Sequence, residues 1–175
     1  MGNESGKSIV TLVILTILVM IGAGVIINYA KQMIAQTREQ DLRTNMLLMQ
    51  AETKKGLEEV CFRTVNLNET KEEDLQKINE IKAEHLDGII LSNSPAEVQE
   101  AIKSVPEFTA DESCYYLDQS TLSEMGITDI DESQHGYFIV KYDFSNADVE
   151  VINTNGYGGN YTLTQIVEKI EGEQE

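Results

Sequence analysis

The sequence has few of the residues on which several common protein classes depend. It has no tryptophan, two cysteines and two prolines, and aromatic residues make up only 6% of the chain. Two cysteines exclude a disulfide-dense scaffold and a four-cysteine metal site. Basic residues are also scarce, since 13 Lys and Arg stand against 30 Asp and Glu and give a net charge of −17. This balance argues against a nucleic-acid-binding protein, for which clustered Lys and Arg are the expected signature.

The negative charge is concentrated in one part of the chain. Residues 1–60 contain six acidic and six basic residues, whereas residues 61–175 contain 24 acidic and seven basic ones and so carry the whole −17. A neutral N-terminal segment therefore precedes a strongly acidic C-terminal one.

Charged residues are absent between Ile9 and Ile27, in the run IVTLVILTILVMIGAGVII. At about 1.5 Å per residue, a helix over this run and its uncharged neighbours is long enough to cross a hydrocarbon layer of ~30 Å. We therefore predict a transmembrane segment at residues 7–30. One other interpretation is a buried core helix, although such helices are rarely apolar on every face. The other is a signal peptide cleaved near Gly22 and Gly24, although the apolar run continues beyond these glycines.

Gly22 and Gly24 have two possible roles within the predicted membrane helix. Each costs about 1 kcal/mol of helix stability relative to alanine. They either permit a close helix–helix contact, where small residues let backbones approach, or mark a place where the helix can loosen. The charges beside the span do not determine its orientation, because Lys7 precedes it and three basic residues follow by residue 43, interleaved with two acidic ones.

The sequence predicts that the membrane helix continues beyond residue 30 as an amphipathic helix over residues 31–61. There is no proline before Pro95 and no glycine between Gly24 and Gly56, which we expect to be the weakest point of the helix. Apolar residues recur at helical spacing, with a polar gap at Thr53. These residues are Ile34, Leu42, Met46, Met49, Leu57 and Val60. This apolar stripe must be buried against another part of the protein. We call the acidic segment at residues 62–175 the head, and we expect it to pack on the stripe.

Within the head, local patterns predict short helices and one antiparallel hairpin. Strands are expected at residues 137–144 and 149–154, joined by a turn and followed by a loop at 155–160. Helices are expected at 71–86 and 120–125, the latter capped by Gly126. Two capping boxes, at Ser94 with Glu97 and at Thr162 with Gln165, predict one helix that ends before Pro106 and another at 163–170. The predicted fold class is therefore α+β, in which a small head with a short antiparallel sheet and short helices packs on a long N-terminal helix.

No motif for nucleophilic catalysis, phosphate binding, dinucleotide binding or a zinc site is present. We therefore predict a non-enzymatic protein with no catalytic residues, no cofactor and no metal. Asp129, Asp131 and Glu132 offer carboxylates that could hold Ca²⁺, but they lack the spaced calcium-loop pattern, which favours a solvated acidic loop. His85 and His135 are isolated histidines.

Two further patterns are left open by the sequence. The triplets Asn68-Glu-Thr70 and Asn160-Tyr-Thr162 match N-glycosylation acceptors, a match that is frequent by chance. We predict one disulfide between Cys61 and Cys114, as expected if the head lies outside the cytoplasm, and the alternative is two buried free thiols.

The N-terminal segment and the order of elements resemble those of type IV pilins and type II secretion pseudopilins. Members of these families have a short polar leader ending in glycine, then a hydrophobic helix that runs into an amphipathic half, and then a small α+β head. Here the leader would be residues 1–6, and the mature helix would begin at Lys7 after cleavage behind Gly6. The resemblance covers nearly the whole chain in architecture and only the N-terminal segment in motif.

Two residues differ from the family's usual pattern. The residue after the cut is usually hydrophobic and here is Lys7. The glutamate usual at the fifth position after the cut is replaced by Thr11, which cannot supply the charge that pairs with a neighbouring subunit's amino terminus. These differences favour a minor subunit over a major one.

The resemblance implies a function, a location and a set of partners. The chain would be a non-enzymatic subunit of a surface filament or secretion pseudopilus, anchored by one membrane span with its head outside the cell and cleaved and methylated as a prepilin. Its partners would be other pilin-like subunits through the N-terminal helix, the membrane and a prepilin peptidase, and not nucleic acid. The alternative is a single-pass anchored extracytoplasmic binding or sensor domain that does not polymerise, for which a flexible linker after Tyr29 would be expected in place of a helix.

Overall fold

The structure is a computed structural model, and it describes the backbone of residues 4–128 and 130–172. Side chains are described for residues 33, 34, 36–128, 130–132 and 134–169. The chain forms two compact units, Met1–Asp41 and Leu42–Glu175. The second unit is the α+β part, and it begins within the long helix.

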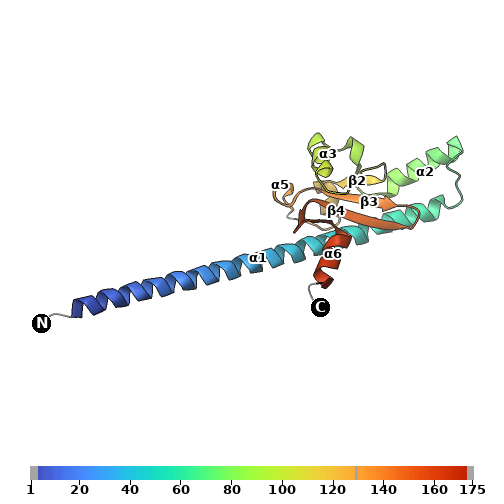
Figure 1. The fold of residues 1–175 in the computed structure, drawn as a ribbon. Coiled ribbons are helices and arrows are strands. Elements are labelled where there is room, and N and C mark those ends of the chain that lie inside the picture. Colours follow the sequence, from blue (N-terminus) through green and yellow to red (C-terminus); the bar gives the residue numbers. More distant parts are fainter. Residues whose placement is uncertain (1–3, 129, 173–175) are drawn as a thin grey trace. The chain divides into compact units, whose positions relative to one another are not determined.

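Helix α1 (Glu4–Thr64) belongs to both units (Figure 1). The predicted continuation of the N-terminal helix is confirmed over its described residues, and the helix ends at Thr64 and not at Cys61. Within the part of the chain whose side chains are described, no helix combines the length and the apolarity needed to span a membrane. The predicted span at residues 7–30, and with it Gly6, Lys7, Gly22 and Gly24, lies outside that part.

The head contains a five-stranded antiparallel sheet in the order β1-β2-β3-β4-β5. Its strands are β1 (Ile89–Ile90), β2 (Cys114–Leu117), β3 (Phe138–Asp143), β4 (Asp148–Tyr157) and β5 (Asn160–Thr162). The predicted hairpin is β3–β4, with Val140 opposite Val151. The predicted loop at 155–160 is wrong at both ends, because β4 continues to Tyr157 and turns tightly through two glycines with positive φ into β5.

Six short helices accompany the sheet in the described part of the chain. They are α2 (Glu72–His85), the 3₁₀ helix η1 (Leu91–Asn93), α3 (Ala96–Lys103), α4 (Gln119–Glu124), α5 (Glu132–His135) and α6 (Leu163–Gly172). The capping box before α6 is confirmed, since Gln165 N donates to Thr162 Oγ1 (3.2 Å) and Thr162 N donates to Gln165 Oε1 (3.2 Å). The other predicted box is wrong: Pro95 occupies the N-cap of α3, and the Ser94 hydroxyl donates instead to Leu91 O (2.7 Å), closing η1.

The two faces of the sheet have separate cores because successive side chains of a strand point to opposite faces. On one face Val140 and Val151 pack in the same cluster as Met46, Met49 and other residues of α1. On the other face a second cluster joins β2, β3 and β4 to η1 and α3. Its buried members are Leu91, Val98, Ile102, Val105, Cys114, Tyr116, Ile139 and Ile152. Figure 1 shows α1 below the sheet and α3 above it. The prediction that the head covers the stripe of α1 is therefore confirmed from residue 42 onward.

Two residues of α1 that interrupt its apolar pattern, Thr53 and Gly56, have structural roles. Thr53 is fully buried, and its hydroxyl donates to Met49 O (2.7 Å), so the gap in the stripe faces the core without an unpaired group. Gly56 is a contact point and not only a weak one, since a Cβ built there would lie 2.1 Å from the carbonyl oxygen of His85 at the end of α2. Only glycine allows the backbone of the α2 end to approach α1 this closely.

Candidate functional site

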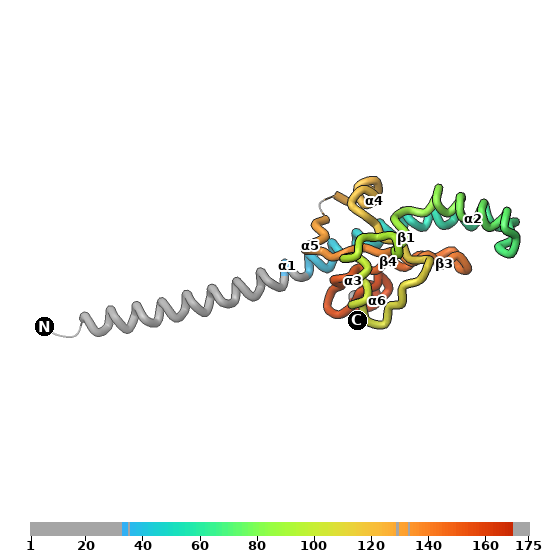
Figure 2. Tube along the Cα trace, turned by 90° about the horizontal axis from the view of Figure 1, so that it is seen from above, coloured from blue at the N-terminus to red at the C-terminus, as the bar shows by residue number. Residues whose placement is uncertain are grey.

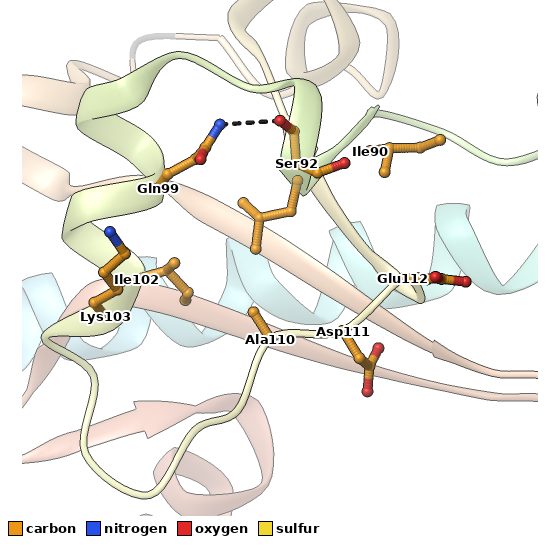
Figure 3. Close-up of a pocket in the computed structure, with 9 residues that line it drawn as sticks. Ile90, Ser92, Gln99, Ile102, Lys103, Ala110, Asp111 and Glu112 are labelled. Atoms are coloured by element: carbon orange, nitrogen blue, oxygen red, sulfur yellow. Dashed lines mark hydrogen bonds between the residues drawn. The ribbon is translucent and has the colours of Figure 1, made fainter.

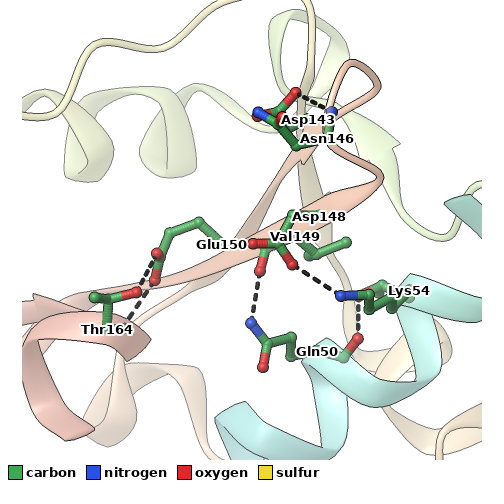
Figure 4. A network of polar contacts seen from close by, with 9 residues as sticks. Gln50, Lys54, Asp143, Asn146, Asp148, Val149, Glu150 and Thr164 are labelled. Carbon is green, nitrogen blue, oxygen red and sulfur yellow. Dashed lines mark hydrogen bonds and ion pairs between the residues drawn. The ribbon is translucent and has the colours of Figure 1, made fainter.

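Polar contacts fix the second half of α1 to the β3–β4 hairpin (Figure 4). Gln50 Nε2 donates to Val149 O (2.7 Å), and the ammonium of Lys54 lies 3.0 Å from a carboxylate oxygen of Asp148. On the same strand, Glu150 accepts from the backbone N–H of Thr164 (3.1 Å) and from its hydroxyl (2.6 Å), which ties α6 to β4. The position of α1 on the sheet is thus set by both the buried stripe and these edge contacts.

The opposite face of α1 carries side chains that are exposed among the described residues of the second unit. Leu47 and Leu48 are 40% and 38% exposed, and the side chains of Thr44 and Ala51, which share this face at helical spacing, are exposed too. We call Thr44, Leu47, Leu48 and Ala51 the outward surface of α1. In the first unit, Met33 and Ile34 are exposed apolar residues of the same helix. Sequence reasoning followed the buried stripe and missed Leu47 and Leu48, although two consecutive leucines beside Met46 already require apolar side chains on a second face.

A second exposed apolar feature lies at the C-terminal end of α1 and in the turn that leads to α2. Phe62 and Val65 are 79% and 73% exposed, the largest exposures among the large apolar residues of the described chain. Figures 1 and 2 show this turn beyond the end of the sheet, where α2 folds back along α1. The turn is thus an unburied tip of the head.

A shallow hollow of about 320 Å³ lies between α3, η1 and the segment at residues 110–112 (Figure 3). Its floor is apolar, with Ile90, Leu91 and Ile102, and its rim carries Lys103 and Glu112. Gln99 is not free to bind a ligand, because its amide donates to Ser92 O (3.1 Å) and Ser94 O (2.9 Å). The hollow therefore offers an apolar patch with few convergent polar groups.

The two cysteines are free thiols, which corrects the predicted Cys61–Cys114 disulfide and removes the support that this bond would give to a head outside the cytoplasm. Cys61 packs against the α1 cluster, whereas Cys114 belongs to the cluster on the opposite face of the sheet. The alternation of β2 decides this, because Tyr115 points to the α1 face and its neighbour Cys114 must point away from it. Burial raises the pKa of both thiols, so neither is an activated nucleophile.

The acidic segment at residues 129–132 is used partly as a structural contact. Glu132 accepts a hydrogen bond from the hydroxyl of Tyr116 (2.6 Å), and Asp131 accepts one from Gln134 (2.9 Å). Asp129 lies outside the described residues. Among the described residues no group of three or more His, Cys, Asp and Glu side chains is arranged to hold a metal ion. The absence of a metal, a cofactor and an enzymatic activity stays a prediction.

The histidines do not face a common site. His135 is exposed, and its Nδ1 lies 3.0 Å from Asp131 O, while its carbonyl accepts from Asn153 Nδ2 (2.9 Å). His85 is at the end of α2, where its backbone carbonyl faces Gly56. The structure therefore does not bring together the residues that the sequence offered as chemical candidates.

One carboxylate beside the α1–α2 contact is unfavourably placed. Burial raises the pKa of Asp87, and the nearby carboxylates of Glu124 and Glu52 raise it further. Its backbone carbonyl accepts from the hydroxyl of the buried Tyr142 (3.1 Å). The residue thus stabilises the core through its backbone while its side chain carries an electrostatic cost.

The chain was compared with protein families, with curated proteins and with solved structures. No family model, no curated protein and no solved structure matches it.

Proposed function

We propose that this chain is a non-enzymatic, pilin-like subunit of a surface filament or secretion pseudopilus, and a minor one because of Thr11. It is anchored by residues 7–30 with its acidic head outside the membrane until it joins the assembly. The observation that carries the proposal is that α1 is two-sided. One side is buried under the sheet, and the outward surface of Thr44, Leu47, Leu48 and Ala51 is exposed on the other.

Two exposed leucines on the side of α1 that faces away from the sheet favour association over a purely structural role. Exposed apolar side chains on a helix that already has a packed face are available to a second helix, which would bury them. The heads of neighbouring subunits repel one another through the net charge of −17, although salt screens this repulsion beyond about 8–10 Å. Cohesion would therefore come from the helices, through the outward surface of α1 and the apolar run that contains Gly22 and Gly24.

The partners follow from the same proposal. Other pilin-like subunits would pack against α1, and a prepilin peptidase would cleave between Gly6 and Lys7. The anchored binding or sensor domain is the second candidate, and the apolar hollow of Figure 3 is the observation in its favour. The described helix from residue 33 to Thr64 favours the first candidate, because it leaves no flexible linker there.

The test is the effect of charge placed on the outward surface of α1. Replacing both leucines, Leu47→Glu with Leu48→Glu, should remove the chain from the sheared filament fraction while its circular dichroism and cooperative unfolding stay those of the folded head. The reason is that carboxylates cannot be buried between helices without partners.

A matched control is available on another helix. Leu75 on α2 is 43% exposed, so Leu75→Glu adds a charge to an equally exposed leucine away from α1 and should leave filament incorporation unchanged. The proposal fails if the double variant enters filaments as the wild type does, or if the Leu75 variant is lost to the same extent.

A further inference from the structure

The two Asn-Xaa-Thr triplets of the chain stand in contrasting environments. Asn68-Glu-Thr70 lies in the turn between α1 and α2, where all three residues are exposed. Asn160-Tyr-Thr162 forms strand β5, where all three residues are half-buried. A transferase that modifies an asparagine side chain needs both a reachable amide nitrogen and a reachable hydroxyl two residues later. The structure distinguishes the triplets on both counts.

At the first triplet the amide nitrogen is free and the hydroxyl faces the amide. Thr70 donates to Asn68 Oδ1 from its hydroxyl (2.8 Å) and from its backbone N–H (3.0 Å). Both contacts use the amide oxygen, and in the described structure Asn68 Nδ2 makes no hydrogen bond. Donors on the oxygen favour the imidate form of an amide, in which the nitrogen is the nucleophile. The backbone carbonyl of Asn68 accepts from Lys71 N (2.9 Å), so the turn holds this arrangement before any enzyme binds.

At the second triplet both groups are occupied. Asn160 Nδ2 donates to Tyr157 O (3.3 Å) and lies 3.5 Å from Gly158 O, within the turn that joins β4 to β5. The hydroxyl oxygen of Thr162 accepts from Gln165 N (3.2 Å) as the cap of α6. Modification of Asn160 would thus require opening both the hairpin turn and the helix cap.

We propose that Asn68 is an N-glycosylation acceptor and that Asn160 is not. The donor is an oligosaccharide carried on a polyprenyl pyrophosphate, and an oligosaccharyltransferase performs the transfer. Asn68 Nδ2 loses one proton to a carboxylate of the transferase and forms a bond to C1 of the first sugar. The bond between C1 and the carrier oxygen breaks, and its electron pair leaves with the pyrophosphate carrier. In the cell this reaction requires the head to lie outside the membrane, and in that one respect the inference rests on the proposed function.

The position of Asn68 also gives the glycan a physical role. Phe62 and Val65, 79% and 73% exposed, belong to the same turn region and form the unburied apolar tip of the head. A bulky hydrated oligosaccharide attached there would reduce nonspecific contact of that tip, in line with the solubilising effect of surface glycans.

The experiment uses the full-length protein in detergent with a purified single-subunit oligosaccharyltransferase that accepts Asn-Xaa-Thr, and with its lipid-linked oligosaccharide. With the further triplet Asn3-Glu-Ser5 removed by Asn3→Gln, intact mass and glycopeptide mapping should show one glycan, on Asn68. Asn68→Gln and Thr70→Ala should lose it, Thr70→Ser should keep it because the hydroxyl is retained, and Asn160→Gln should keep it. No glycan on Asn68, or a glycan on Asn160 of the folded chain, would overturn the proposal.

A digest of the same protein tests the structural reason. In peptides the contacts of Asn160 with Tyr157 and Gly158 are lost, so both triplets should then accept the glycan. If the Asn160 peptide is refused as well, the folded turn is not what protects it and the structural argument is wrong. Filament assembly plays no part in this reaction. A failure of glycosylation would therefore leave the proposed function standing, and an absence of filaments would not alter the glycosylation result.

Discussion

At the scale of single residues, the contact between Gly56 and the end of α2 shows how position decides the effect of a residue. A glycine inside an exposed helix normally lowers helix stability by about 1 kcal/mol relative to alanine. Here a Cβ would lie 2.1 Å from His85 O and 3.2 Å from the carbonyl carbon, both rigid backbone atoms. The absence of a side chain is thus what allows α1 and the end of α2 to meet.

Gly56→Ala should therefore destabilise the protein, by a net of about 1–2 kcal/mol, because overpacking costs more than the gain in helix propensity. Ala51→Gly, the opposite exchange at an exposed position of α1, should also destabilise, by about 1 kcal/mol. Chemical denaturation of the full-length protein in detergent measures both. A Gly56→Ala variant more stable than wild type would contradict the close contact.

The side chain of Asp87 predicts a pH dependence. Burial, aided by Glu124 and Glu52, raises its pKa above the ordinary 3.8, so the folded state binds the proton more readily than the unfolded state. This contribution therefore makes the free energy of unfolding fall as pH rises through the range just above 3.8, and the cost is fully present at neutral pH. Asp87→Asn should be more stable than wild type at pH 7, and the difference should vanish near pH 3. An Asn variant that is less stable at pH 7 would show that the carboxylate is favourably placed.

At the scale of elements, the sequence predicted those helices and strands of the head that are determined by residues close together in the chain. The turn at residues 145–148 and the Thr162–Gln165 box each lie within a few residues, and both the β3–β4 hairpin and α6 form as expected. Strand β1 has only two residues, and β2 reads as a uniform apolar run, so neither carries a period from which it could be predicted. Ser94 bonds backward to Leu91 and not forward to α3, a choice between two adjacent turns that the sequence does not decide.

The features that the sequence did not predict depend on which face of the sheet or of α1 a side chain lies on. Compartment chemistry alone predicts a bond between Cys61 and Cys114, whereas the strand alternation that separates the two thiols depends on the position of β2. A single apolar stripe on α1 accounts for its buried side and does not include Leu47 and Leu48, which lie on the exposed side.

The capping box of α6 gives a prediction at the same scale. Gln165 Oε1 accepts from Tyr161 N (2.9 Å) and from Thr162 N (3.2 Å), so Gln165→Ala leaves two donors at the β5–α6 junction without this partner. The free energy of unfolding should fall by about 0.5–2 kcal/mol, with early hydrogen exchange of the α6 amides. Glu168→Ala, at an exposed position of the same helix, should stay within about 0.5 kcal/mol of wild type. Equal effects of the two changes would mean that the box contributes nothing.

At the scale of the whole molecule, charge and apolar surface are divided between different parts of the chain. The head carries the acidic excess, and its cysteine Cys114, its histidines and its acidic loop serve packing or local bonds among the described residues. The long helix carries the apolar run and the outward surface. This division is what a subunit needs if its helix associates while its head stays solvated, and it leads to the central claim of assembly without catalysis.

The most direct test of that claim is the distribution of the chain between the membrane and sheared surface filaments in the cells that produce it. We expect the chain to be present in the high-mass filament fraction in a form that begins at Lys7. Replacing Gly22 and Gly24 by leucine should reduce this fraction while the head stays folded. If the chain is found solely as an uncleaved, monomeric membrane protein, at every expression level and beside a functioning assembly system, it is not a filament subunit and the anchored binding domain is favoured.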